Sequence, residues 1–211
     1  MALLQDRSTA RRWYTAVSPF YDAFVAETFW PTRLQRQFLD RLGLSPADRV
    51  LDIGCGTGVT TRAVSERAAS VVGVDHSQSQ LTRATRKGLD AALVRADAES
   101  LPFPDDAFDA VVSVGTIIYL PDPVAALDEA RRVTRPNGRI LVAGFNRTHF
   151  PSWVPIENWA TPVNEALFHT WNGAEAREQF ATAGWDIVET DVTGPGWHPR
   201  LARVVTASNS V

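Results

Sequence analysis

The chain has 211 residues, of which 45% are hydrophobic and 21% charged, and its formal net charge is −3. These values are typical of a globular protein with one complete core, and without a basic excess we expect no nucleic-acid partner. The longest apolar stretch, near residues 110–120, is only half of the ~20 residues that cross a bilayer. Because the N-terminus also becomes charged too early for a signal peptide, we expect a soluble, cytoplasmic protein without a membrane span.

Two rare amino acids narrow the chemistry further. Cys55 is the only cysteine, which excludes an internal disulfide and a cysteine-rich zinc site. Lys87 is the only lysine and lies in the polar stretch TRATRKG, whereas lysine nucleophiles are normally desolvated. The composition therefore argues against disulfide, zinc–cysteine and lysine-based chemistry.

Short apolar segments alternate with helical segments from residue 49 onward. Apolar runs of this length, bounded by polar residues or glycine, are typical of buried parallel strands. We predict five strands, over residues 49–54, 70–75, 92–96, 108–115 and 139–145. Helices are predicted over residues 59–68, 77–87 and 123–133. Strands that alternate with helices in this way form parallel βαβ units in a doubly wound sheet.

Two segments lie outside this alternation. Residues 1–45 precede the first strand, and residues 147–172 form an aromatic, proline-containing insertion of a length that is usually functional or separately structured. A helix over 173–183 and strands over 186–192 and 202–207 complete the chain. We therefore predict one α/β domain over residues 1–211, with a doubly wound, Rossmann-like, seven-stranded and mostly parallel sheet. Its segments are an N-terminal helical lid (1–45), a ligand-binding core (46–146), a substrate-side insertion after strand five (147–172) and a C-terminal helix and strands (173–211).

The most informative segment is VLDIGCGTG at residues 50–58, which joins the first strand to the next helix. Glycines here allow a sharp turn and let a ligand approach the backbone, and the helix N-terminus then faces that ligand. The spacing is GxGxG, with Val59 where a dinucleotide fingerprint requires its last glycine. Asp52 before the turn would repel a pyrophosphate but suits a cationic group such as an amino-acid ammonium.

Two further carboxylates follow the next two strands. Asp75 ends the second strand, where an acid can accept both hydroxyls of a ribose. Asp97 follows the third strand and is placed for an adenine amino group, with Ala98 as a small apolar neighbour. Sites for an amino acid, a ribose and an adenine in this order indicate S-adenosylmethionine as the cofactor, with S-adenosylhomocysteine as its product.

With these motifs the sequence resembles the class I S-adenosylmethionine-dependent methyltransferases, including the type 11 and quinone-biosynthesis-like small-molecule enzymes. The matching segments are VLDIGCGTG, VVGVDHS, RADAESLPFPDDAFDAVVS and PNGRILVAGF, and the resemblance is close over residues 49–144 and looser from 173 onward. It implies that the methionine part is cradled by Gly54, Gly56 and Gly58, the ribose held by Asp75, the adenine edge by Asp97, and the ammonium group by the backbone of Ser113 and Val114.

Four other residues beside these motifs are candidate cofactor contacts, and each has a second interpretation. Asp52 either faces the cationic part of the ligand or is a buried acid that ties the turn together. Cys55 is either a cofactor neighbour or a small packing residue. His76 and Glu99 either contact the adenosine part or belong to the surface.

The N-terminal segment SPFYD at residues 18–22 is similar to the tyrosine–aspartate motif of quinone-biosynthesis methyltransferases. This resemblance implies that Tyr21 caps the cofactor carboxylate and that Asp22 lies near the acceptor. Tyr14 and Tyr21 would gain partners only in the complex, so we predict that this segment becomes ordered when cofactor binds. The later signature segments of quinone C-methyltransferases are not evident, which leaves the acceptor open.

Aromatic residues concentrate in the two segments that flank the core, and five of the seven tryptophans lie in the last third of the chain. A cleft closed by these segments would suit a small apolar or aromatic acceptor, such as a quinone-like or phenolic compound, although the same residues could simply pack the lid. If the acceptor must lose a proton, the candidate bases are His149, His169 and Tyr119. We predict no metal, because Asn146 is followed by Arg147 and Thr148 rather than by magnesium ligands.

Alternative functions remain open from the sequence. The segment SVGT at residues 113–116 lacks the turn found in enzymes that methylate base amines, yet methylation of a protein or RNA group is a second interpretation. A non-catalytic S-adenosylmethionine-binding regulator is a third. A nicotinamide oxidoreductase is disfavoured by Val59 and Asp52. A lipid quinone acceptor would allow peripheral membrane contact, and the oligomeric state is not predicted.

Overall fold

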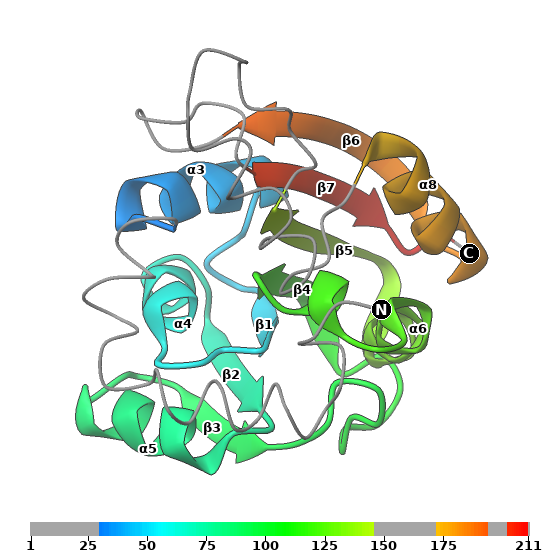
Figure 1. Cartoon of the computed structure of the whole chain (residues 1–211). Helices are drawn as coiled ribbons and strands as arrows, with labels where there is room; N and C mark the ends of the chain where they lie inside the picture. Colours follow the sequence, from blue (N-terminus) through cyan, green and yellow to red (C-terminus); the bar gives the residue numbers. More distant parts are fainter. Residues whose placement is uncertain (1–29, 146–171, 194–201, 211) are drawn as a thin grey trace, which may run out of the picture.

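The computed structural model describes residues 30–145, 172–193 and 202–210, which form one seven-stranded sheet with helices on both faces (Figure 1). The strand order is β3-β2-β1-β4-β5-β7-β6. The strands are β1 (Arg49–Ile53), β2 (Ser70–Asp75), β3 (Ala92–Arg95), β4 (Phe108–Val114), β5 (Thr134–Phe145), β6 (Asp186–Thr193) and β7 (Ala202–Ser208). The predicted seven-stranded, mostly parallel, Rossmann-like sheet is confirmed.

The direction of the strands divides the sheet into two parts. β3, β2, β1, β4 and β5 are parallel neighbours, whereas β7 is antiparallel to both β5 and β6. β1 lies between β2 and β4, so the chain winds outward in opposite directions on its two sides. Ligands of doubly wound sheets bind at the carboxyl ends of the strands beside such a reversal.

The helices form a layer on each face of the sheet (Figure 1). One layer contains α3 (Thr32–Leu42), α4 (Val59–Ser65) and α5 (Gln78–Arg86). The other contains α6 (Pro123–Val133) and α8 (Gly173–Thr182), with the short helix η3 (Ile117–Tyr119) between β4 and α6. Pro123 fills the first turn of α6 and Asp122 caps it by accepting a hydrogen bond from the Ala125 N–H, which explains why this helix begins where the sequence predicts.

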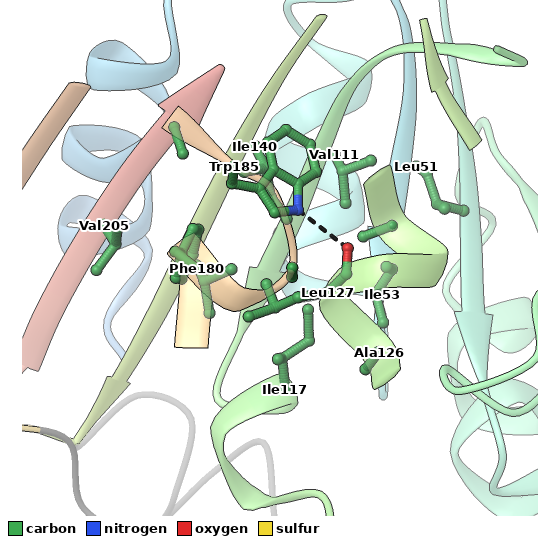
Figure 2. Close-up of a cluster of buried hydrophobic side chains, with 14 of the residues drawn as sticks. Leu51, Ile53, Val111, Ile117, Ala126, Leu127, Ile140, Phe180, Trp185 and Val205 are labelled. Atoms are coloured by element: carbon green, nitrogen blue, oxygen red, sulfur yellow. Dashed lines mark hydrogen bonds between the residues drawn. The ribbon is translucent and has the colours of Figure 1, made fainter. Parts of the chain in front are cut away.

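The two helix layers enclose separate hydrophobic cores because successive residues of each strand point to opposite faces. Leu51 and Ile53 of β1 pack toward α6 and α8, whereas Val50 packs toward α3 and α4. On the α6 side, the indole N–H of Trp185 donates to the Leu127 carbonyl at 3.0 Å, so the loop after α8 is bonded to α6 inside the core (Figure 2).

The described end of the predicted lid segment, residues 30–45, contains α3, which packs into the core: Leu34, Phe38 and Leu39 are almost completely buried. The helix packs against α4, β5 and β7. Residues 1–29 lie outside the described residues, so the lid itself stays a prediction. In the described part of the chain, no helix is both long and apolar enough to cross a bilayer.

Candidate functional site

A cavity of about 200 Å³ lies at the carboxyl ends of the parallel strands. Four loops provide most of its wall, and α3, α4 and α5 complete it. The lining residues are Gly54–Thr57 after β1, Val74–Ser77 at the end of β2 and just beyond it, Ala96–Glu99 after β3, Val114–Thr116 and Tyr119–Pro121 at the end of β4 and beyond it, Trp30 before α3, and the helical residues Gln35, Val59, Thr60 and Gln80.

The glycine-rich turn forms the floor of the cavity beside β1. The N–H groups of Gly54 and Cys55 both donate to the Val74 carbonyl, at 2.8 and 2.9 Å, which ties the turn to β2. Gly54 has φ +75°, and a Cβ at this position would overlap the Oγ1, Cγ2 and Cβ atoms of Thr116. Only glycine satisfies both the backbone conformation and the close approach of the loop after β4.

Asp75 is held in one orientation at the end of β2. Its Oδ2 accepts the Gly56 N–H at 2.9 Å and its Oδ1 accepts the Ser77 N–H at 2.8 Å. Burial raises the pKa of the Asp75 carboxyl, opposed by the two N–H donors and by the neighbouring His76. Because each carboxylate oxygen has a further lone pair, the fixed carboxylate can accept two more hydrogen bonds from a ligand in the cavity.

Asp52 is not among the residues that line the cavity. The side chain is 1% exposed and accepts a hydrogen bond from the Thr61 hydroxyl at 2.7 Å. Burial raises the pKa of Asp52 to about 7, with the Thr61 bond lowering it and the charge of Asp75 raising it. The geometry thus supports the interpretation of Asp52 as a buried acid that ties the turn to α4.

Cys55 lines the cavity but is buried, with 5% of its surface exposed. Burial raises the pKa of the thiol, and the nearby carboxylates of Asp52 and Asp75 raise it further. A thiol that stays protonated is a poor nucleophile. The side chain is therefore a small wall residue of the cavity.

The loop after β3 brings Asp97, Ala98 and Glu99 to the opposite end of the cavity from Gly115 and Thr116 along the strand order. The Glu99 N–H donates to Asp97 Oδ1 at 3.1 Å, and the Ser100 N–H donates to the Asp97 carbonyl at 3.1 Å. These local bonds fold the loop into a compact turn that presents the acidic side chains.

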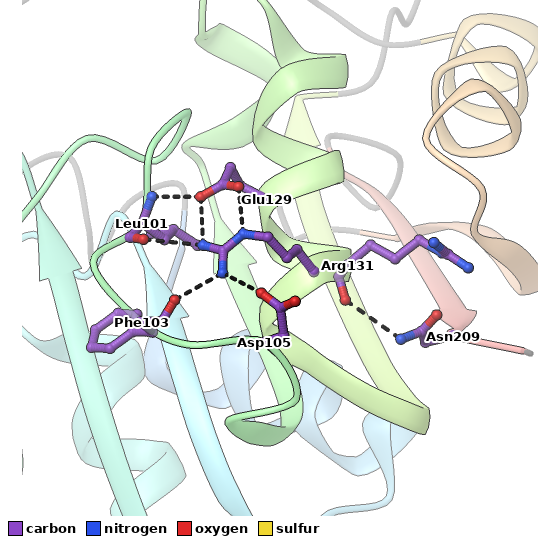
Figure 3. Close-up of polar contacts among 7 residues, drawn as sticks. Leu101, Phe103, Asp105, Glu129, Arg131 and Asn209 are labelled. Atoms are coloured by element: carbon purple, nitrogen blue, oxygen red, sulfur yellow. Dashed lines mark hydrogen bonds and ion pairs between the residues drawn. The ribbon is translucent and has the colours of Figure 1, made fainter.

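An Arg–Glu pair on α6 fastens the continuation of this loop (Figure 3). Glu129 accepts the Leu101 N–H at 2.7 Å and two bonds from the Arg132 guanidinium. Arg132 also donates to the carbonyls of Leu101 and Phe103 and to the carboxylate of Asp105, at 2.8–3.1 Å. The Arg132 contact holds the pKa of Glu129 below its usual value. No local sequence pattern marks this pair, because its partners are mainly backbone atoms.

The end of β4 and the segment after it contribute Val114 and Tyr119 to the cavity wall. Ser113 is not among the lining residues: its side chain is fully buried and its hydroxyl accepts the Ile117 N–H at 3.4 Å. Gly58 also lies outside the cavity wall: a Cβ there would overlap the Leu89 side chain, so this glycine allows the segment after α5 to pack against the turn.

The structure brings together ten of the residues selected from the sequence: Gly54, Cys55, Gly56, Asp75, His76, Asp97, Ala98, Glu99, Val114 and Tyr119. Asp52, Gly58 and Ser113 flank the cavity without lining it. Tyr14, Tyr21, His149 and His169 lie outside the described residues. The sequence did not predict that α3, α4 and α5 contribute to the wall, because helix side chains that face a cavity follow no local motif. Among these side chains, the Thr60 hydroxyl donates to Gln35, and Gln35 donates to the Trp30 carbonyl.

The charge of the cavity wall restricts its ligand. Asp75, Asp97 and Glu99 contribute carboxylates, and none of the described lining residues is arginine or lysine. A pyrophosphate would meet repulsion here, whereas a nucleoside with a cationic tail would not. No group of three or more potential metal ligands occurs among the residues that the structure describes. The fold and the wall thus define a Rossmann-like domain with an acidic cavity at the carboxyl ends of its parallel strands.

Comparison with known proteins agrees with this class. A family model described as a methyltransferase domain matches residues 51–142. A demethylmenaquinone methyltransferase from Corynebacterium urealyticum is 33% identical over 161 residues, covering 74% of this chain and 67% of the relative. The chloroplastic 2-methyl-6-phytyl-1,4-hydroquinone methyltransferase of Arabidopsis thaliana is 32% identical over 206 residues, covering 95% of this chain and 59% of the relative. The chain belongs to the class I S-adenosylmethionine-dependent methyltransferases.

Further comparisons concern the length of the relatives and the fold of solved structures. The chain spans only 50–59% of the length of the first relatives it matches, among them a demethylmenaquinone methyltransferase from Beutenbergia cavernae that is 40% identical over 123 residues, 58% of this chain. Among solved structures, the cyclase SpnF has a TM-score of 0.76 at 22% identity, covering 96% of both chains. A SAM-dependent methyltransferase from Aquifex aeolicus has a TM-score of 0.69 at 20% identity, covering 92% of this chain and 97% of the other. These likenesses show the fold alone.

Proposed function

We propose that this protein binds S-adenosylmethionine in the cavity and transfers its methyl group to a small apolar or aromatic acceptor of the hydroquinone or phenol type. The observation that carries the proposal is the convergence of the glycine turn, the fixed Asp75 carboxylate and the Asp97 loop around a cavity whose described lining residues include no arginine or lysine. The described residues fit the cofactor: an acid already oriented by two N–H donors can accept ribose hydroxyls, and glycine leaves room for the ligand against the backbone.

Each part of the wall has a task in this proposal. Asp75 accepts the ribose hydroxyls, Asp97 accepts from the adenine amine, and the turn at Gly54 and Gly56 lies against the methionine part. When bound, S-adenosylmethionine supplies an electrophilic sulfonium methyl. The protein then has to exclude water and align the acceptor for in-line attack, which by itself supplies much of the acceleration.

The acceptor class is supported by the names of the relatives. Those named above are described as acting on demethylmenaquinone or a methylphytylhydroquinone. A hydroquinone must lose a proton as it is methylated, so a base is useful. Tyr119 lines the cavity, and His149 and His169 lie in the segment after β5; we propose these three as candidate bases.

Calorimetric titration with S-adenosylhomocysteine, with NADH and NADPH in parallel, tests the cofactor. We expect micromolar binding of S-adenosylhomocysteine alone, on the order of 8 kcal/mol. Asp75→Ala should abolish it, and Asp90→Ala, which removes an exposed acid between α5 and β3, should leave it unchanged. Binding of a nicotinamide cofactor instead, or equal binding by the two variants, would contradict the proposal.

Turnover with hydroquinones and phenols tests the acceptor. Each candidate base is replaced in turn, by His149→Ala, His169→Ala and Tyr119→Phe. Only the variant that removes the base should lower turnover and alter the pH profile of turnover. If all three variants retain the wild-type profile, none of them is the base. Cofactor binding without transfer to any small acceptor would favour the regulatory or macromolecular alternatives.

A further inference from the structure

Gln80 occupies a position in the cavity wall where its polarity is unexpected. It lies in the first turn of α5 and shares the buried face of that helix with Leu81 and Ala84. The side chain is 3% exposed and lines the cavity. Helix positions that face the core normally carry apolar residues, so a carboxamide here needs a polar partner.

Among the described residues, the oxygen of that carboxamide has no such partner. Gln80 Oε1 is buried and, within the described part of the chain, accepts no hydrogen bond. Gln35 is also buried, but its oxygen accepts the Thr60 hydroxyl at 2.6 Å. Gln78, two residues before Gln80 in the same helix, is exposed. Because an unpaired buried acceptor destabilises a folded protein, its retention in a cavity wall points to a donor on a ligand.

The position of α5 indicates which part of a ligand this donor belongs to. α5 connects β2 to β3 and contacts both strands. The loops at the ends of these strands carry Asp75 and Asp97, the two acids assigned to ribose and adenine above. Gln80 therefore lies on the adenosine side of the cavity rather than beside the methionine part.

We propose that Gln80 is a cofactor-binding residue whose carboxamide oxygen accepts a hydrogen bond from an N–H or O–H group of the adenosine part of S-adenosylmethionine. This inference rests on the proposed function, since it takes the cofactor as the occupant of the cavity. It adds a third acceptor, supplied by a helix, to the two carboxylates supplied by the strand ends.

Titration of S-adenosylhomocysteine into Gln80→Met tests the contact. Methionine has nearly the same length but no comparable acceptor, and we expect binding about tenfold weaker, the effect of one hydrogen bond. Gln78→Met makes the same change two residues earlier on the exposed side of the helix and should bind as wild type does. Equal affinities for wild type and Gln80→Met would overturn the inference.

A second measurement separates a ligand contact from a structural role. If Gln80 were needed for folding, Gln80→Met would lower the melting temperature of the ligand-free protein. If its oxygen bonds only a ligand, the variant should be at least as stable as wild type without ligand and should gain less stability when S-adenosylhomocysteine is added. A lower melting temperature without ligand, together with an unchanged ligand-induced gain, would overturn the inference.

Analogues of the ligand identify the donor. S-Inosylhomocysteine lacks the adenine amine, and the 2′-deoxy and 3′-deoxy forms of S-adenosylhomocysteine each lack one hydroxyl. The analogue that lacks the donor should bind equally to wild type and Gln80→Met. If the variant weakens all three equally, the donor is not in the adenosine part and the assignment is wrong. If wild type itself does not bind S-adenosylhomocysteine, the proposed function fails as well, which distinguishes that failure from one confined to Gln80.

Discussion

At the scale of single residues, Asp52 and Asp75 show how one type of side chain serves two purposes in neighbouring strands. Their carboxylates differ in their partners: Asp75 accepts two backbone N–H groups and faces the cavity, whereas Asp52 accepts one hydroxyl and is buried beneath the turn. A buried acid with a single neutral donor is expensive to ionise. This cost makes Asp52 a source of pH-dependent stability.

We predict that Asp52 lowers the stability of the protein as the pH rises from about 4 to about 7. Its pKa is raised to about 7 in the folded state, against 3.8 for the ordinary carboxyl. Between these values the unfolded chain has released the proton while the folded chain still holds it, so unfolding is favoured increasingly with pH. Well above pH 7 the folded chain has also released the proton, so Asp52 lowers the free energy of unfolding no further.

Replacement by asparagine checks this sign. Asp52→Asn keeps an oxygen for Thr61 but does not titrate, so its stability relative to wild type should improve by about 1–4 kcal/mol between pH 4 and pH 8. Urea unfolding at both pH values measures the difference. A matched Asp90→Asn variant corrects for general charge effects, and an Asp52→Asn difference that does not vary with pH would refute the prediction.

The two cavity glycines of the turn should differ sharply in their tolerance of a methyl group. Both have positive φ, +75° at Gly54 and +53° at Gly56, but only at Gly54 would a Cβ overlap another residue. We expect Gly56→Ala to cost about 1 kcal/mol through backbone strain and Gly54→Ala roughly 2–5 kcal/mol, since Thr116 must also move. Adding Thr116→Gly to Gly54→Ala should recover part of the loss. Chemical denaturation measures all three, and equal costs for the single variants would contradict the geometry.

At the scale of elements, the pair formed by Glu129 and Arg132 links α6 to the loop that carries Asp97. Arg132 holds two carbonyl groups and Glu129 holds one N–H of residues 101–103, so the backbone of the loop is fastened on both sides (Figure 3). Asp105 adds an ion pair to Arg132, but its side chain is 74% exposed. Glu129 and Asp105 should therefore contribute unequally to the free energy of unfolding.

We predict that Glu129→Ala costs about 1–3 kcal/mol, because it leaves the Leu101 N–H and the Arg132 guanidinium without their shared acceptor. Asp105→Ala, which removes only a surface ion pair, should cost less than about 1 kcal/mol. Hydrogen exchange across residues 97–105 should accelerate in Glu129→Ala alone, and S-adenosylhomocysteine should bind it more weakly. If the two variants exchange alike, the pair does not hold the loop.

At the scale of the whole molecule, the site joins segments from both helix layers, so ligand binding should be linked to global stability. α3 and α4 contribute Gln35 and Thr60 from one layer, while the loop after β3 is fastened to α6 in the other. A ligand that bridges these parts stabilises only the folded chain.

We predict that S-adenosylhomocysteine at one hundred times its Kd stabilises the protein by about 2.7 kcal/mol. For a chain of this length that corresponds to a rise in Tm of roughly 5–10 °C. Thermal unfolding followed by circular dichroism measures the shift, with NADH as the negative control. An unchanged Tm at saturating S-adenosylhomocysteine, or an equal rise with NADH, would contradict a linked site.

The sequence by itself determined the order of strands and helices and the residues that end the strands at the site. Hydrophobic runs, a capped proline start and a glycine turn act locally, which is why α6 and β2 have their predicted bounds and why Asp75 and Asp97 reach the cavity. The carboxyl ends of parallel strands share one edge of a sheet, so residues there converge whatever the details of packing.

Only the tertiary structure decided which way side chains point within the fully buried parts. β1 is covered on both faces, so no alternation of polar and apolar residues in the run Val50–Ile53 reveals that Asp52 is buried and lies outside the cavity wall. The roles of α3, Gln80 and the Glu129–Arg132 pair were likewise hidden. Each depends on contacts between segments distant in the chain, and such contacts are fixed by how the layers pack, not by any local pattern.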